Sequence, residues 1–126
     1  MLIRSFRDLD VYVRSKAQAM ELFHLTESFP KSETYSLTDQ IRRSSRSVAA
    51  NIAEAWGKRR YANSFVAKLS DSEAELYETQ AWLDFSLECG YITDEQYSGL
   101  QERYEALVRS IVGMITYPDK WCLKTK

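Results

Sequence analysis

Apolar residues recur at steps of three and four positions along four long stretches of the chain, which is the period of an amphipathic α-helix. No stretch alternates apolar and polar residues in the way that a half-buried strand would. We predict helices over residues 8–29, 37–59, 62–89 and 94–117, followed by a loose tail over 119–126. Long helices joined by short connections favour an all-α fold, an up-down-up-down antiparallel four-helix bundle that forms a single domain over residues 1–126.

Turn and capping residues support these limits. Pro30 follows the first stretch, Gly90 the third and Pro118 the fourth. Thr93, with Gln96 three positions later, has the pattern of a capping box at the start of the fourth helix.

The predicted core takes one apolar stripe from each helix. The stripes are Leu9, Tyr12, Val13, Met20 and Phe23; Ile41, Ser45, Val48, Ile52, Ala55 and Trp56; Phe65, Leu69, Ser72, Leu76, Thr79, Leu83 and Leu87; and Tyr97, Leu100, Tyr104, Leu107, Ile111 and Ile115.

The first and third helices also carry a second apolar stripe on the side away from the predicted core. A helix that is apolar on two sides is usually buried on two sides, whereas a monomeric bundle offers each helix one interior. We therefore predict subunit contacts in a homo-oligomer at Val11, Leu22, Leu25, Phe29, Ala74, Ala81 and Phe85. The alternative is that these are ordinary exposed apolar side chains.

The composition is that of a water-soluble globular protein, with 44% hydrophobic and 28% charged residues and only 4 Gly and 2 Pro. No apolar run approaches the ~18 residues of a membrane helix, and the first residues do not resemble a secretory signal, so we predict a cytoplasmic protein without a membrane role. The net charge of −1 conceals an asymmetry. Residues 1–70 contain 12 Lys and Arg against 7 Asp and Glu, and residues 71–126 contain 5 against 11.

Basic residues concentrate along the second predicted helix and just after it. We predict a nucleic-acid-binding surface, which would act mainly through phosphates, at Arg42, Arg43, Arg46, Lys58, Arg59 and Arg60. Tyr61 stands beside this cluster, where it could stack on an unpaired base. Two alternatives remain: the arginines pair with carboxylates of the acidic half, or the protein is a scaffold that binds only other proteins.

No pattern in the sequence indicates catalysis. The single histidine, His24, excludes a two-histidine metal site, and no nucleophile elbow, P-loop or dinucleotide-binding glycine motif occurs. The acidic run in the third helix favours salt bridges or a solvated face over acid–base chemistry. We expect a non-enzymatic protein without a metal or another cofactor.

Several blocks of the chain resemble one known family. They are Leu37-x-x-Gln40-Ile41-Arg42-Arg43-Ser44-Ser45, Ser47-Val48-x-x-Asn51-Ile52-Ala53-Glu54, Ser72-x-x-Glu75-Leu76-x-Glu78-Thr79-Gln80, Cys89-Gly90-Tyr91-Ile92, and the opening Phe6-Arg7-Asp8-Leu9-x-Val11. This order is similar to that of bacterial four-helix-bundle proteins encoded in intervening sequences of 23S rRNA genes, over roughly Phe6 to Ile115. Ala55-Trp56 and Asp71 depart from the usual pattern of that family.

The resemblance implies a four-helix bundle that assembles as a ring, a homopentamer. It also implies kinship with accessory proteins of diversity-generating retroelements, which bind a reverse transcriptase and nucleic acid through a basic surface. Possible partners are therefore a second copy of the chain, RNA or DNA, and a protein such as a reverse transcriptase. We expect Asn51 and Glu54 to take part in a hydrogen-bond network between helices or subunits.

Overall fold

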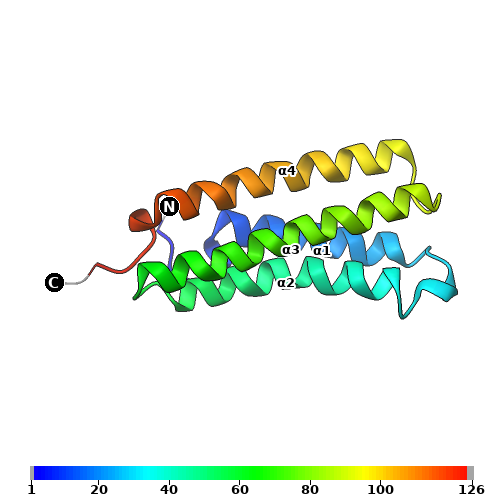
Figure 1. The fold of residues 1–126 in the computed structure, drawn as a ribbon. Helices are drawn as coiled ribbons and strands as arrows, with labels where there is room; N and C mark the ends of the chain where they lie inside the picture. The colour runs from blue at the N-terminus through cyan, green and yellow to red at the C-terminus, as the bar shows by residue number, and fades with distance from the viewer. Residues whose placement is uncertain (1, 125–126) are drawn as a thin grey trace.

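The computed structural model describes residues 2–124, and in this range the chain forms four α-helices and no strand (Figure 1). The helices are α1 (Asp10–Thr26), α2 (Leu37–Gly57), α3 (Ala62–Glu88) and α4 (Asp94–Thr116). Short 3-10 helices precede α1, connect α1 to α2 and follow α4; these are η1 (Phe6–Asp8), η2 (Lys31–Glu33) and η3 (Pro118–Lys120). The all-α prediction is confirmed. Of the predicted tail, residues 125–126 lie outside the described residues.

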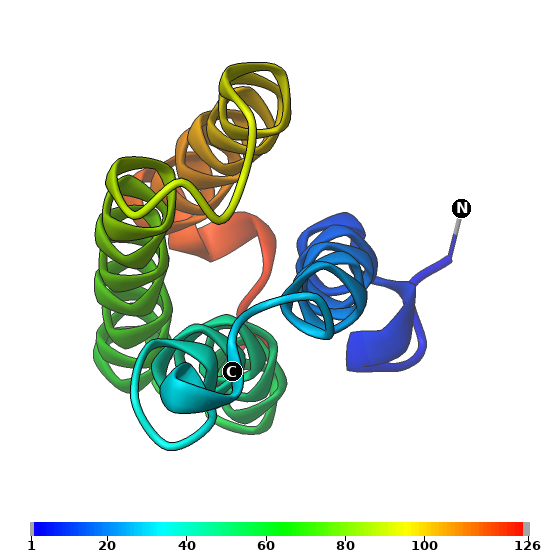
Figure 2. The same ribbon diagram turned by 90° about the vertical axis from the view of Figure 1, so that its right-hand side faces the viewer.

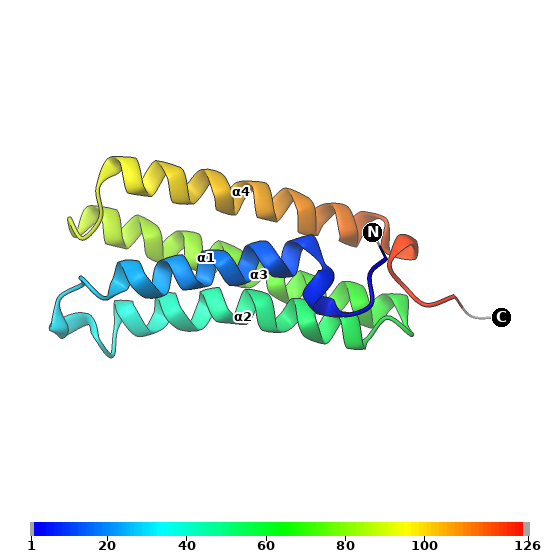
Figure 3. The same cartoon turned by 180° about the vertical axis from the view of Figure 1, so that it is seen from behind.

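Consecutive helices run in opposite directions and lie side by side, as the end-on view shows (Figure 2). The pair α2 and α3 shares the most extensive packing, and α1 and α4 contact each other least of the four neighbouring pairs. Both described ends of the chain lie at the same end of the bundle as the α2–α3 turn (Figure 3). None of the helices within residues 2–124 is long and apolar enough to cross a lipid bilayer.

The ends of α3 and α4 follow the predicted capping signals. Gly90 has a φ of 76°, and after it the N–H of Tyr91 donates to the carbonyl of Ser86 at 2.9 Å. This bond and the positive φ are those of a Schellman motif. The Thr93 hydroxyl accepts from the Gln96 N–H at 3.0 Å, and the Gln96 side chain accepts from the Thr93 N–H at 2.9 Å. The capping box is therefore present.

Small hydroxyl residues allow α2 and α3 to approach closely. Ser72 is fully buried and donates to the Val48 carbonyl at 2.8 Å, and Thr79 donates to the Ser44 hydroxyl at 2.8 Å. Around these bonds the apolar core includes Ile41, Ile52, Phe65, Leu69, Leu76, Leu83, Leu107 and Ile111. The predicted core faces of α2, α3 and α4 are correct in their main positions.

The predicted core stripe of the first helix is correct at Leu9, which is buried, but wrong at Val13 and Met20. Met20 and Val13 are 45% and 53% exposed, whereas Leu22 is 0% exposed and lies in the core. Val11 and Phe29 are also buried in the same chain. They are therefore core residues of one subunit, and the prediction that Val11, Leu22 and Phe29 form a subunit contact is wrong as well.

Polar residues on the buried side of α1 explain the error. Ser15, Gln18 and Thr26 share a side with Leu22, so the sequence pattern assigned the core to the opposite side and predicted the Leu22 side to be a subunit contact. The hydroxyls of Ser15 and Thr26 form hydrogen bonds within the helix, because Thr26 donates to the Leu22 carbonyl at 2.8 Å and Ser15 donates to the Tyr12 carbonyl at 3.0 Å.

Candidate nucleic-acid interface

The structure divides the six predicted nucleic-acid-binding residues into two groups. Arg42, Arg43 and Arg46 lie in the first half of α2, and Lys58, Arg59 and Arg60 lie in the turn between α2 and α3. At a rise of about 1.5 Å per residue, roughly 18 Å of helix axis separates the two groups. Each group must therefore be judged by its own surroundings.

The Arg42 side chain forms hydrogen bonds to α1. Its Nε donates to the Thr26 hydroxyl at 2.9 Å, and its Nη2 donates to the Phe23 carbonyl at 3.2 Å. The guanidinium also lies over the Phe23 ring, 4.6 Å from the centroid. Arg42 therefore joins α2 to the last turn of α1 and satisfies a carbonyl that the helix end leaves free. The Nε donor and one Nη2 donor of Arg42 are thus already used in the fold.

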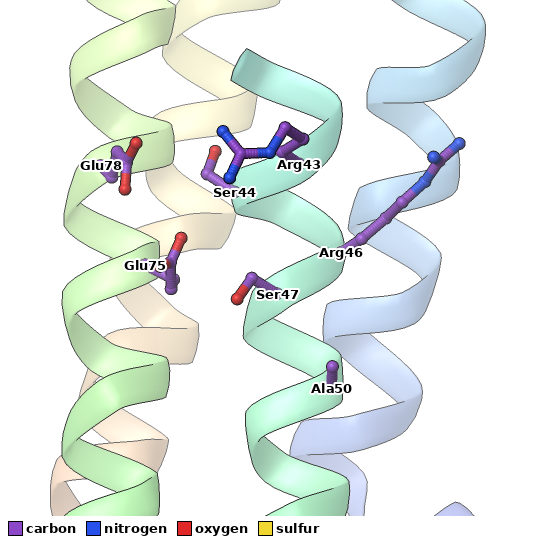
Figure 4. Close-up of a pocket in the computed structure, with 7 residues that line it drawn as sticks. All are labelled: Arg43, Ser44, Arg46, Ser47, Ala50, Glu75 and Glu78. Carbon is purple, nitrogen blue, oxygen red and sulfur yellow. The ribbon is translucent and has the colours of Figure 1, made fainter. Parts of the chain in front are cut away.

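Arg43 and Arg46 point away from each other (Figure 4). Arg43 extends over a groove of about 400 Å³ between α2 and α3, toward Glu75 and Glu78. Burial and the neighbouring Glu78 raise the pKa of Glu75, which indicates crowded carboxyl groups. Because these carboxylates would repel a polyanion, the groove is a poor place for phosphate.

Arg46 extends toward α1, where its guanidinium lies 5.8 Å from the centroid of the Phe23 ring. Within residues 2–124, no ion pair joins Arg42, Arg43 or Arg46 to a carboxylate. The predicted alternative, direct pairing with the acidic half, does not occur in this part of the chain, although Arg43 faces two carboxylates across the groove.

The second group belongs to a larger cluster at one end of the bundle, which we call the basic end. It combines cations from the residues before α1, the α2–α3 turn and the residues after α4: Arg4, Arg7, Lys58, Arg59, Arg60, Lys120 and Lys124. These three segments meet at the end of the bundle that carries both termini (Figure 3). Asp8 and Asp119 are the carboxylates of the same segments, and Asp8 accepts from the N–H groups of Arg4 and Ser5.

Aromatic side chains accompany these cations. The Arg59 guanidinium lies 3.4 Å from the centroid of the Trp56 ring, and its Nε donates to the Trp56 carbonyl at 2.8 Å. The Leu123 N–H donates to the Arg59 carbonyl at 3.0 Å, which brings the C-terminal segment against the α2–α3 turn. Tyr61 and Tyr117 are exposed nearby. The basic end thus offers both charge and open aromatic rings.

The opposite end of the bundle is acidic. The α1–α2 connection contains Lys31 and the carboxylates Glu27 and Glu33, and three further carboxylates lie at the adjoining helix ends: Glu88 at the end of α3 and Asp94 and Glu95 at the start of α4. The Tyr91 hydroxyl donates to Glu33 at 2.9 Å and joins the α1–α2 and α3–α4 connections. This bond is the main cause that lowers the pKa of Glu33, with a second contribution from the Leu37 N–H. The two ends of the bundle thus differ in charge, and each end combines residues from both halves of the sequence.

Sequence reasoning identified part of the basic end. The cluster at Lys58–Arg60 was visible as a run, whereas Arg4, Lys120 and Lys124 are isolated cations near the chain ends. Only the antiparallel topology brings them to the α2–α3 turn. No local signal in the sequence could have found them.

The two polar residues of the family pattern in α2 have different roles. Glu54 accepts from Lys68 of α3 at 3.3 Å, an exposed ion pair between helices. Asn51 donates to the Ser47 carbonyl at 3.0 Å and so bonds within α2. The predicted inter-helix contact is therefore observed for Glu54, whereas the Asn51 bonds in the described residues stay within its own helix.

The remaining predicted subunit contacts lie mainly on α3. Ala74, Ala81 and Phe85 are exposed, and Phe85 exposes 53% of its surface. Leu25 is partly buried against the core.

His24 lies on the surface of α1 with its Nδ1 3.1 Å from Glu27, and residues 2–124 hold no cluster of His, Cys, Asp and Glu that could bind a metal ion.

Comparisons with known proteins identify the family of this chain. A solved structure of a protein of unknown function from the S23 ribosomal protein family of Bacteroides thetaiotaomicron has the same fold, with a TM-score of 0.76 and 27% sequence identity over 84% of this chain and 95% of that protein. No curated protein matches the sequence. The family profile of the 23S rRNA-intervening sequence protein matches residues 7–113, in agreement with the resemblance of the sequence blocks. The chain therefore belongs to the 23S rRNA-intervening sequence protein family.

Proposed function

We propose that this protein is a non-catalytic adaptor that binds RNA or DNA through its basic end, mainly by contacts to phosphates. The observation that carries this proposal is the convergence of cations from three segments distant in the sequence. Release of counterions from neutralised phosphates would supply the affinity without reading a base sequence. Tyr61 and Tyr117 would add stacking on unpaired bases, which favours single-stranded regions.

The other half of the predicted surface contributes less in this proposal. Arg42 is bonded to α1, and Arg43 faces Glu75 and Glu78. The acidic end would orient the molecule, because it repels the polyanion that the basic end attracts.

The test is fluorescence anisotropy with a labelled stem-loop RNA at about 50 mM and 200 mM salt. We expect the affinity of the natural protein to fall steeply with salt. The double variant Lys58→Glu, Arg60→Glu should bind far more weakly and show a salt slope reduced by up to about 2. The matched control is Lys31→Glu with Arg43→Glu, which makes the same charge change away from the basic end and should retain most of the affinity.

Two outcomes would contradict the proposal: binding that does not depend on salt, or equal loss of affinity in both double variants. A protein that retains no RNA or DNA but captures a specific protein partner would instead support the alternative function, a protein-only scaffold.

We also propose that the chain forms a homo-oligomer through the exposed face of α3. Ala74 and Ala81 are small residues in helical register with Phe85, which leaves a large apolar ring in solvent. In the homopentameric ring that the family resemblance implies, the basic end would be repeated around the ring. Light scattering on a sizing column should show an oligomer that Phe85→Glu dissociates and the control Val112→Glu, on α4, does not. A natural protein that elutes as a monomer would contradict this proposal.

A further inference from the structure

A cavity of about 420 Å³ opens at the acidic end of the bundle, where the connection from α1 to α2 meets the end of α3. Its volume is in the range of sites that bind small molecules. Aromatic side chains line it from both segments, Tyr35 from the connection and Trp82 and Phe85 from α3. We call it the aromatic cavity. It is separate from the basic end and shares only Phe85 with the α3 face proposed above as a subunit contact.

The fold leaves these aromatic rings open to a ligand. Tyr35 is 96% exposed and Phe85 is 53% exposed. Trp82 is partly buried against the core, and its ring centroid lies 5.9 Å from that of Phe85. The face of an aromatic ring carries the negative part of its quadrupole and attracts a cation. Three rings around one cavity therefore favour a positively charged ligand with an apolar surface.

One carboxylate, that of Glu33, lines the same cavity. Its Oε2 accepts from the Tyr91 hydroxyl at 2.9 Å, and its Oε1 accepts from the Leu37 N–H at 3.3 Å. Because these bonds lower the pKa of Glu33, the carboxylate is ionised at neutral pH. Within residues 2–124, no Lys or Arg lines the aromatic cavity and no ion pair engages Glu33. The cavity thus holds a negative charge that no cation of the described chain balances.

The helix ends beside the cavity leave the sign of its charge unchanged. The start of α2 carries a partial positive charge, and the end of α3, at Cys89, carries a partial negative charge. Because these two contributions oppose each other, the charge of Glu33 decides the sign. Around the cavity, Glu27 and Glu88 add negative charge, and Lys31 offsets only one of them. The potential at this end of the bundle therefore attracts cations.

The hydrogen-bond acceptors of the cavity favour a cation that carries no N–H donor. Each oxygen of Glu33 already accepts one bond. The Oε1 of Gln40, which also lines the cavity, accepts at 3.3 Å from Arg43, whose side chain lines the groove between α2 and α3. A primary ammonium brings three donors that lose water on entry and each need an acceptor. A quaternary ammonium brings none, so the cavity suits it better.

We propose that the aromatic cavity binds a ligand that carries a quaternary ammonium group. The methyl groups pack on the rings of Tyr35, Trp82 and Phe85, and the carboxylate of Glu33 balances the positive charge. Aromatic rings combined with a nearby negative charge are a recurrent way to recognise this group. The site depends neither on nucleic-acid binding at the basic end nor on the oligomer.

The test is a titration of the ¹⁵N-labelled full-length protein with choline chloride, followed by NMR, against the same concentrations of sodium chloride. The indole N–H signal of Trp82, assigned with Trp82→Phe, should shift and reach half-saturation at or below about 10 mM choline. The indole signals of Trp56 and Trp121, at the opposite end of the bundle, should stay unchanged. The uncharged analogue of choline, in which carbon replaces the quaternary nitrogen, should bind at least about tenfold more weakly.

Two pairs of variants test the residues of the site. Glu33→Gln keeps the size and an acceptor but removes the charge, and it should weaken choline binding about tenfold, whereas Glu95→Gln at the same end should not. Tyr35→Ala removes an exposed ring and should weaken binding about fivefold, whereas Tyr61→Ala at the basic end should have no effect. Tyr35 and Tyr61 are both exposed, so these two variants keep the test valid if Glu33→Gln lowers stability.

A second arm identifies the carrier of the group. Choline is compared with a short uncharged peptide that contains one trimethyllysine, with the unmethylated peptide as control. Binding of the methylated peptide at least about tenfold tighter than that of choline would assign the group to a protein side chain. Equal or weaker binding would assign it to a free small cation.

Three results would overturn the proposal. They are a Trp82 signal that does not saturate up to about 100 mM choline, equal binding of choline and its uncharged analogue, and equal effects of Glu33→Gln and Glu95→Gln. A neighbouring copy that covers the cavity through Phe85 would give the first of these results. RNA affinity and oligomer mass are separate measurements, so a failure here is distinct from a failure of the proposed function.

Discussion

Replacing Leu22 and Met20 by alanine tests which side of α1 forms the core. Leu22 is 0% exposed and belongs to the apolar core, whereas Met20 is 45% exposed. Truncation of a buried Leu to Ala removes its transfer free energy and leaves a cavity, and it costs about 2–5 kcal/mol of unfolding free energy. Truncation of Met20 should cost less than about 1 kcal/mol, because much of its side chain remains in water. Leu and Met have similar helix propensities, so burial accounts for the difference.

Urea unfolding followed by circular dichroism measures the two effects. For a slope of about 2 kcal/mol per molar urea, Leu22→Ala should lower the midpoint by roughly 1–2 M and Met20→Ala by less than about 0.5 M. The experiment is repeated over a range of protein concentrations. A larger loss for Met20→Ala would refute the placement of α1. So would a loss for Leu22→Ala that appears only where the protein dissociates, because Leu22 would then be the subunit contact that the sequence pattern predicts.

Three further predictions concern the helix ends and the acidic end. Thr93→Ala removes the cap of α4 and should lower the unfolding free energy by about 1 kcal/mol in the same urea assay. Gly90→Ala should lower the unfolding free energy by roughly 1–2 kcal/mol, because the φ of 76° is unfavourable for any residue with a Cβ. The space around Gly90 is open, so the added methyl group meets no neighbour. An unchanged unfolding free energy would contradict the left-handed conformation. Tyr91→Phe should raise the pKa of Glu33 toward 4.5, as measured by NMR titration, because the mutation removes the main bond that lowers it. The stability that this bond gives is present above the unfolded pKa of Glu33 and is lost as the pH falls through the lowered folded pKa. The unfolding free energies of the natural protein and of Tyr91→Phe should therefore converge at acid pH. A difference that stays constant with pH would contradict the assignment.

The sequence determined where the helices lie and which faces of α2, α3 and α4 are buried. In these three helices the apolar residues form one dominant stripe, exemplified by Ile41, Leu76 and Leu107, and the caps at Gly90 and Thr93 mark the boundaries. These features depend on residues within a few turns of each other. Local geometry therefore suffices to predict them.

The periodicity of apolar residues did not identify the core face of α1, because both sides of this helix are apolar. α1 has apolar residues on both sides, and the buried side also holds Ser15 and Thr26, whose hydroxyls bond to carbonyls of the same helix. The periodicity cannot show that such polar groups are satisfied. The position of α2 against α1 determines which side of α1 is buried, because Arg42 of α2 forms hydrogen bonds to the end of α1 and covers that side of the helix.

Only the tertiary structure decided how the charges are arranged. In the sequence the balance of charge differs between the two halves of the chain, and the basic run of α2 looked like one continuous surface. In the bundle the antiparallel topology brings the segments that contain Arg4 and Lys120 to the same end as the α2–α3 turn, while Arg43 faces Glu75 of the neighbouring helix. Electrostatic interactions depend on distance in space, and that distance is fixed by which helices are neighbours and in which direction they run.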